Sequence, residues 1–164
     1  MRHIILLVLI ISLTFLNCDS RNSESKNDDF DLTSENLNYN EELAAQLGAD
    51  EYGMSKYVLA FLKSGPNRNQ DSLTAANLQQ AHLANIQKLA DEGKLVLAGP
   101  FMDDGQIRGI YIFNTESVEE AIQLTETDPA IKAGRLTMEL HPWYGSAVLK
   151  KVNHLHKAVA KKLF

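Results

Sequence analysis

The stretch Lys94–Asn114, KLVLAGPFMDDGQIRGIYIFN, decides the fold, because it holds two apolar segments joined by turn residues. Lys94–Ala98 and Gln106–Phe113 are rich in aliphatic and β-branched residues, as strands are. Between them, Met102–Gly105 predicts a tight turn whose Asp-Gly pair can take the positive φ of a short hairpin. Gly99-Pro100 predicts a bulge or kink, since proline cannot donate to a β-ladder. The stretch therefore predicts an antiparallel hairpin.

Upstream of this hairpin, the sequence predicts a buried strand and then a long helix. Tyr57–Leu62 is apolar in both alternating sets, which is typical of a strand buried on both faces. Asp71 can cap a helix over Ser72–Glu92, and Gly93 can end that helix in the left-handed conformation. One stripe of the helix must face the sheet, with His82 at its centre: Ala75, Leu78, His82, Ile86 and Leu89.

Downstream of the hairpin, a second helix and a last strand are predicted. Ser117–Glu120 is a capping box, and Asp128-Pro129 ends the helix, because a residue before proline is pushed out of the α region. The expected buried stripe of this helix is Val118, Ala121, Ile122 and Thr125. Pro129–Gly134 predicts a turn, and Leu136–Leu140 predicts the last strand, which leads into His141–Gly145.

The order of elements is therefore β-α-β-β-α-β, which predicts a ferredoxin-like α+β fold with an antiparallel sheet. Two helices can cover only one face of such a sheet, whereas the first strand is apolar on both faces. We therefore expect a homodimer in which two sheets pack face to face, the dimeric α/β-barrel architecture.

Composition restricts the partners. The 164 residues carry a formal net charge of -5, which disfavours nucleic acid as a partner. The single cysteine, Cys18, excludes an intrachain disulfide. We expect no cofactor.

The N-terminus predicts a signal peptide over residues 1–17. Two basic residues precede Ile4–Leu16, an apolar run of 13 residues that is shorter than the roughly 20 a membrane-spanning helix needs. Leu16-Asn17-Cys18 resembles a bacterial lipoprotein cleavage site, in which Cys18 becomes the lipidated first residue. This predicts a lipid-anchored protein of the bacterial cell envelope, on its periplasmic or outer-membrane face. The alternative is an ordinary signal peptide followed by an incidental cysteine.

The remaining chain divides by composition into three parts. Residues 18–52 are polar and acidic and predict a disordered tether after the lipidated cysteine, with a short helical turn at Glu41–Leu47 ended by Gly48. Residues 53–149 form the predicted domain. Residues 150–164 predict a basic amphipathic helical tail, which packs on the domain or a partner subunit, or contacts anionic lipid.

The motifs of the predicted domain resemble the YciI-like (YCII-related) family, which shares its architecture with muconolactone isomerases. Their order and spacing carry the resemblance: Tyr57–Leu62, His82-Leu83, Gly93–Leu95, Leu97–Pro100, Asp104-Gly105, Gly109, Ser117, Glu119–Ala121, Asp128-Pro129, Lys132–Gly134 and His141–Trp143. In this family a histidine on the first helix and an aspartate after the second are proposed as a catalytic pair. The resemblance implies that His82 and Asp128 are that pair here.

Such a pair has a clear chemical logic. A carboxylate that accepts a bond from one imidazole nitrogen fixes the tautomer and leaves the other nitrogen as a general acid or base. The alternative is a core histidine satisfied by a carbonyl, and an aspartate that only caps a helix. The domain holds no cysteine, and neither Ser64 nor Ser72 lies in a nucleophile motif, which favours isomerisation or elimination over acyl transfer. The other hypothesis is a non-catalytic module of the envelope that binds a ligand or a protein.

Two further residues are candidates for a ligand pocket. Arg108 could orient an anionic ligand or be a solvated edge charge, and Trp143 could line a pocket or the dimer interface. We expect no metal site, because His154 and His156 are two residues apart on a helix and point in different directions, and His141 has no neighbouring ligand cluster.

Overall fold

The computed structural model describes residues 38–162. The predicted signal peptide, Cys18 and most of the predicted tether lie outside the described residues. Along the chain, the elements are α1 (Glu41–Gln46), β1 (Met54–Ser64), α2 (Ser72–Asp91), β2 (Leu95–Pro100), β3 (Ile107–Phe113), α3 (Val118–Thr125), α4 (Pro129–Lys132), β4 (Leu136–Ser146), the 3₁₀ helix η1 (Ala147–Lys151) and α5 (Val152–Val159).

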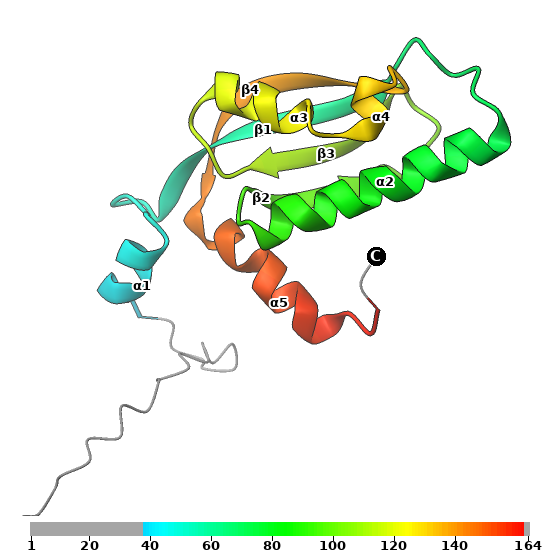
Figure 1. The fold of residues 1–164 in the computed structure, drawn as a ribbon. Coiled ribbons are helices and arrows are strands. Elements are labelled where there is room, and N and C mark those ends of the chain that lie inside the picture. Colours follow the sequence, from blue (N-terminus) through cyan, green and yellow to red (C-terminus); the bar gives the residue numbers. More distant parts are fainter. Residues whose placement is uncertain (1–37, 163–164) are drawn as a thin grey trace, which may run out of the picture. The chain divides into compact units, whose positions relative to one another are not determined.

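The four strands form one antiparallel sheet in the order β2-β3-β1-β4 (Figure 1). With α2 between β1 and β2, and α3 and α4 between β3 and β4, this is the predicted ferredoxin-like α+β fold, which is confirmed. The first strand lies between β3 and β4, and it contributes apolar residues to the clusters on both faces of the sheet. In the described part of the chain, no helix is long and apolar enough to cross a membrane.

The main core lies between the sheet and the helices α2 and α3. It contains Val58, Ala60 and Leu62 from β1, together with Leu89 of α2 and Leu124 of α3. Asp71 caps α2 through the backbone N–H groups of the first turn, and Gly93 follows the helix with a φ of 70°. The predicted stripe of α2 faces the sheet, and two of its residues, His82 and Leu89, are buried.

The hairpin differs from its prediction in two respects. Gly99 and Pro100 continue β2 in register opposite Ile110 and Gly109, and the irregularity lies between Leu95 and Leu97 instead. Both β2 and β4 are edge strands, and an edge strand tolerates a proline without a bulge. The turn prediction was also wrong at Gly105, since its φ is not positive. The hairpin loop runs from the end of β2 to Ile107 and is long enough to need no left-handed residue.

Two further boundaries differ from the prediction. β4 continues to Ser146, six residues beyond the predicted end, and pairs with β1 along its whole length despite Pro142. In α3, Ile122 is exposed and Leu124 takes its place in the core. Ser117 caps α3 as predicted, but its own N–H donates to the Thr115 hydroxyl, so only half of the capping box forms.

The second face of the sheet is partly covered by the C-terminal segment of the same chain. Leu149 of η1 packs with Trp143 against a small cluster of Tyr57, Val96 and Ile112. Asn153 of α5 donates to the backbone carbonyl of Leu95 at 2.6 Å, and Figure 1 shows α5 beside β2. The tail thus covers apolar surface that we had assigned to a second subunit.

Candidate active site

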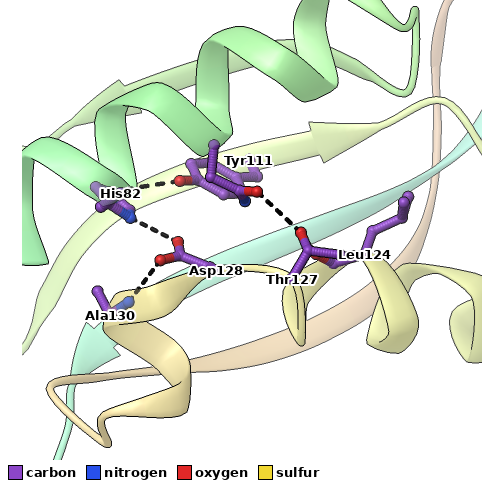
Figure 2. Close-up of polar contacts among 7 residues, drawn as sticks. His82, Tyr111, Leu124, Thr127, Asp128 and Ala130 are labelled. Carbon is purple, nitrogen blue, oxygen red and sulfur yellow. Dashed lines mark hydrogen bonds and ion pairs between the residues drawn. The ribbon is translucent and has the colours of Figure 1, made fainter.

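The structure brings His82 and Asp128 into direct contact, although they are 46 residues apart (Figure 2). His82 Nδ1 lies 2.6 Å from Asp128 Oδ2. The carboxylate is fully buried, and the histidine is 7% exposed. Because an ionised carboxylate can only accept, Nδ1 carries the proton and donates it, and Nε2 is the nitrogen left for other partners.

Asp128 is held in place because it also begins α4. Its Oδ1 accepts a hydrogen bond from the Ala130 N–H at 2.8 Å, so the residue is the N-cap of this short helix. Pro129 occupies the first helical position, where a missing N–H costs nothing. The two carboxylate oxygens therefore serve two purposes: one caps α4 and the other orients His82. Capping a helix and contacting His82, which are alternatives for Asp128 from the sequence alone, are therefore compatible.

A third polar group, the hydroxyl of Tyr111, completes the arrangement. It comes from β3, and its oxygen lies 3.4 Å from His82 Nε2. The two rings stack, with centroids 6.2 Å apart. Burial, and secondly the negative charge of Asp128, raise the pKa of Tyr111, so the phenol stays neutral and can donate its proton to Nε2. At 3.4 Å this contact is long, and a bound molecule could replace it.

The histidine and the tyrosine both line a cavity of about 370 Å³ between α2 and the sheet. Apolar groups make much of its wall, among them Leu62, Ile86 and Phe101. Asp128 lies behind His82 and does not line the cavity. The arrangement is therefore a buried carboxylate, an imidazole at the wall, and a partly open cavity large enough for a small organic molecule.

Three arginines, Arg68, Arg108 and Arg135, also line this cavity. The fold brings them together, because β1 ends, β3 begins and β4 begins at the same edge of the sheet. The registers Lys63 opposite Ile107 and Ser64 opposite Leu136 fix this convergence. No carboxylate lines the cavity within the part of the chain that the structure describes.

The predicted pocket residues separate in the structure. Arg108 lines the cavity beside the histidine, whereas Trp143 lies on the other face of the sheet, where its ring packs on Tyr57 at 5.8 Å. His141 Nε2 is 2.9 Å from Glu139 Oε1 at the surface. Between residues 38 and 162, no three His, Cys, Asp or Glu side chains lie close enough together to hold a metal ion.

Tyr111, Arg68 and Arg135 are cavity residues that the sequence did not single out. Tyr111 is one apolar-looking position in a strand, and nothing in its neighbours marks it as polar. The arginines carry a weak signal: Arg135 directly precedes the last predicted strand and Arg68 lies in the loop after the first, and the β-α-β-β-α-β order places those strand ends together.

The fold and the site define a ferredoxin-like α+β domain with a buried His–Asp pair at the wall of a cavity. The family model of the YCII-related domain matches residues 57–143, just over half of the chain, and the chain belongs to this family. The curated proteins contain no match. One similar solved structure is 5-chloro-2-hydroxyhydroquinone dehydrochlorinase from Burkholderia phenoliruptrix AC1100, in complex with 2,5-dihydroxybenzoquinone. The match has 26% sequence identity and a TM-score of 0.41, and it covers 53% of this chain and 92% of that one.

Proposed function

We propose that this protein is an enzyme that moves a proton on a small organic molecule, in an isomerisation or an elimination. His82 is the general acid and base, and Asp128 is the positioning residue behind it. The observation that carries this proposal is the 2.6 Å contact between His82 Nδ1 and Asp128 Oδ2 directly behind the wall of a cavity.

The chemistry follows from the nitrogen that Asp128 leaves free. His82 Nε2 accepts a proton from a carbon next to a carbonyl group, and the electron pair of the C–H bond moves onto the carbonyl oxygen as an enolate. In an isomerisation, the protonated ring returns the proton to a different carbon. In an elimination, the enolate re-forms the carbonyl, its C=C pair becomes a double bond between the α and β carbons, and the leaving group departs from the β carbon as an anion. His82 then gives its proton to water.

The neighbouring groups fit these steps. The buried Asp128 carboxylate stabilises the imidazolium that forms when Nε2 takes the proton, because the two groups are in direct hydrogen-bond contact. The neutral Tyr111 hydroxyl can donate to an enolate oxygen in place of its long bond to Nε2. Apolar side chains such as Ile86 and Leu83 line the cavity beside His82.

Solvent isotope exchange tests the proposal without knowledge of the full reaction. Neutral and anionic carbonyl compounds are incubated with the protein in D₂O, and loss of the α-proton signal is followed by ¹H NMR. We expect exchange with the wild-type protein and a loss of at least about 100-fold in His82→Gln, since a positioned general base contributes roughly 10²–10⁴-fold. His141→Gln, at an exposed histidine on β4, is the matched control.

The second candidate is a binding module without catalysis, which the Tyr111 contact favours, because it gives His82 Nε2 a partner of its own. On that hypothesis, no compound exchanges faster with the wild-type protein than with His82→Gln. This result would remove the enzyme proposal.

We further propose that the protein is anchored in the bacterial envelope through a lipidated Cys18. The apolar run before this residue supports the proposal. We expect Cys18→Ser to move the protein from the membrane fraction to the soluble fraction of the source cells. Membrane association unchanged by the substitution would contradict the anchor.

We also propose a homodimer through the second sheet face. The support is the pair Leu59 and Phe61, which stay only half-buried on this face although Leu149 packs against the same cluster as Leu59. Phe61→Glu should give a monomer in sedimentation experiments, and Leu73→Glu, at an exposed position of α2, should not change the assembly. A wild-type monomer would exclude this interface.

A further inference from the structure

We infer that the cavity recognises a substrate that carries a carboxylate group, and that Arg68 and Arg135 bind this group. The inference rests on the proposed function, since it names the substrate class of the same site.

The distribution of charge supports this inference. The described residues contain three arginines, and all three line this one cavity. The ion pairs of the described residues involve lysines and histidines, and none of them contains an arginine. In a chain with a net charge of -5, carboxylates are abundant. Three guanidinium groups that gather at a cavity without a carboxylate partner therefore offer their charge to a ligand.

Hydrogen bonds hold the side chains of Arg68 and Arg135 at the same part of the cavity wall. Arg68 Nη1 donates to the backbone carbonyl of Arg135 at 3.3 Å, and Arg135 Nη1 donates to Gln70 Oε1 at 2.9 Å. Each bond engages only Nη1, and Nη2 and Nε of both residues have no partner among the described residues. A guanidinium group presents its donors as a planar fork that fits the two oxygens of a carboxylate.

Arg108 has a different position, at the hairpin end of the cavity. Its Nη1 donates to the backbone carbonyls of Asp103 and Gly105, so part of this side chain holds the loop between β2 and β3. The Asp103 carboxylate accepts from the Gly105 N–H and forms no ion pair with Arg108 within 4 Å. Arg108 thus combines a structural bond with a positive charge at the wall, and Arg68 and Arg135 are the better test of recognition.

The site chemistry fits a substrate of this class. A carboxylate bound by Arg68 and Arg135 fixes one end of the molecule, so that a carbon further along can lie at His82 Nε2. Positive charge at the wall also stabilises an enolate that develops there. An apolar cavity would not otherwise hold an anion, because desolvation of a lone carboxylate is costly.

Binding of simple probes tests the inference. Benzoate and its neutral analogue benzamide are titrated into the ¹⁵N-labelled full-length protein, and the dissociation constants are obtained from amide shifts of cavity residues. We expect benzoate to bind at least about tenfold more tightly than benzamide, and Arg68→Gln and Arg135→Gln each to remove about tenfold of the benzoate affinity. Lys132→Gln is the matched control, since this exposed lysine of α4 carries the same charge and does not line the cavity.

The outcomes separate this inference from the proposed function. Selective binding of benzoate that depends on the arginines, without isotope exchange for any compound, leaves carboxylate recognition in place and removes the enzyme. Isotope exchange with neutral and anionic compounds alike, and equal affinities for benzoate and benzamide, keeps the enzyme and overturns this inference. A loss of affinity in Lys132→Gln as large as in the arginine variants would also overturn it, since it would show a general effect of charge.

Discussion

Replacement of Asp128 separates its two functions, because asparagine keeps one of them and alanine keeps neither. Asp128→Asn retains an oxygen that can accept from the Ala130 N–H, and asparagine is as good an N-cap as aspartate. It places an NH₂ group against His82, so Nδ1 must become the acceptor and the ring must change its tautomer. Asp128→Ala removes both hydrogen bonds and leaves two buried donors without a partner.

The structure gives the magnitudes. Loss of an N-cap costs about 1 kcal/mol, within a range of roughly 0.5–2 kcal/mol. Asp128→Asn replaces the charge-assisted hydrogen bond to His82 with a neutral one, which costs about 1 kcal/mol, whereas loss of the partner in Asp128→Ala costs roughly 1–3 kcal/mol. We therefore expect the free energy of unfolding to fall by about 1 kcal/mol in Asp128→Asn and by about 2–5 kcal/mol in Asp128→Ala, and the difference between the two variants measures the cap together with the hydrogen bond to His82.

Two assays test this reasoning together. Urea unfolding gives the stabilities, and long-range ¹H–¹⁵N NMR of the imidazole ring shows which nitrogen of His82 carries the proton. We expect the Nδ1–H tautomer in the wild-type protein and the Nε2–H tautomer in Asp128→Asn. Asp71→Asn is the control, because Asp71 caps α2 in the same way but lies at the surface without a histidine, and it should change stability by a few tenths of a kcal/mol. An unchanged tautomer in Asp128→Asn, or equal stability of the asparagine and alanine variants, would refute the two-function account.

Three further predictions concern packing and pH. Gly109→Ala should lower the free energy of unfolding by more than about 1 kcal/mol, because a Cβ would lie 2.6 Å from the Gly99 carbonyl oxygen. Gly99→Ala meets open space and should be close to neutral in the same urea assay. Leu89→Ala should lower the free energy of unfolding by about 2–5 kcal/mol, since this residue is 2% exposed. Leu73→Ala, at a residue that is 71% exposed, should change it only slightly, and equal effects of the two variants would contradict the assigned core. The pKa of Tyr111 is raised in the folded protein, so above its ordinary value near 10 the unfolded chain releases this proton first and stability falls as the pH rises. Tyr111→Phe should reduce that fall by up to about 1.4 kcal/mol per pH unit, and identical alkaline slopes of urea stability in both proteins would contradict the assignment.

The sequence predicts the fold well because the residues that begin and end its helices are recognisable from their local sequence. Asp71 and Gly93 mark both ends of α2, and Ser117 marks the start of α3. The periodicity of α2 places its apolar stripe on the sheet, and the element order then leaves one common topology. The errors occur where tertiary contacts, and not the neighbouring sequence, decide what a residue does. Gly99-Pro100 predicts a bulge or kink and the last strand is predicted to end at Leu140, but both Pro100 and Pro142 lie within edge strands, where proline is tolerated.

The site could be predicted only in part, since its contacts are long-range. Spacing alone does not indicate whether a histidine on α2 meets an aspartate 46 residues later, and the family resemblance supplied that pair. Tyr111 lies in a strand that looks apolar throughout, so its hydroxyl gives no periodic signal. The arginine pair forms because separate strand ends meet at one edge of the sheet, which is a property of topology rather than of any local pattern.

Stability alone does not explain why the interface between α2 and the sheet contains a histidine and a carboxylate. The start of α4 needs a cap, which serine would provide, and the core position on α2 would accept leucine at no cost in hydrogen bonds. A buried charged pair is often no more stable than apolar residues of similar volume, while removal of one partner alone is strongly destabilising. The His82–Asp128 contact is thus a polar feature that the fold does not require, and it lies at the wall of the cavity where the arginines gather. The proposed proton-transfer chemistry in that cavity would account for its position and its cost, which stability alone does not.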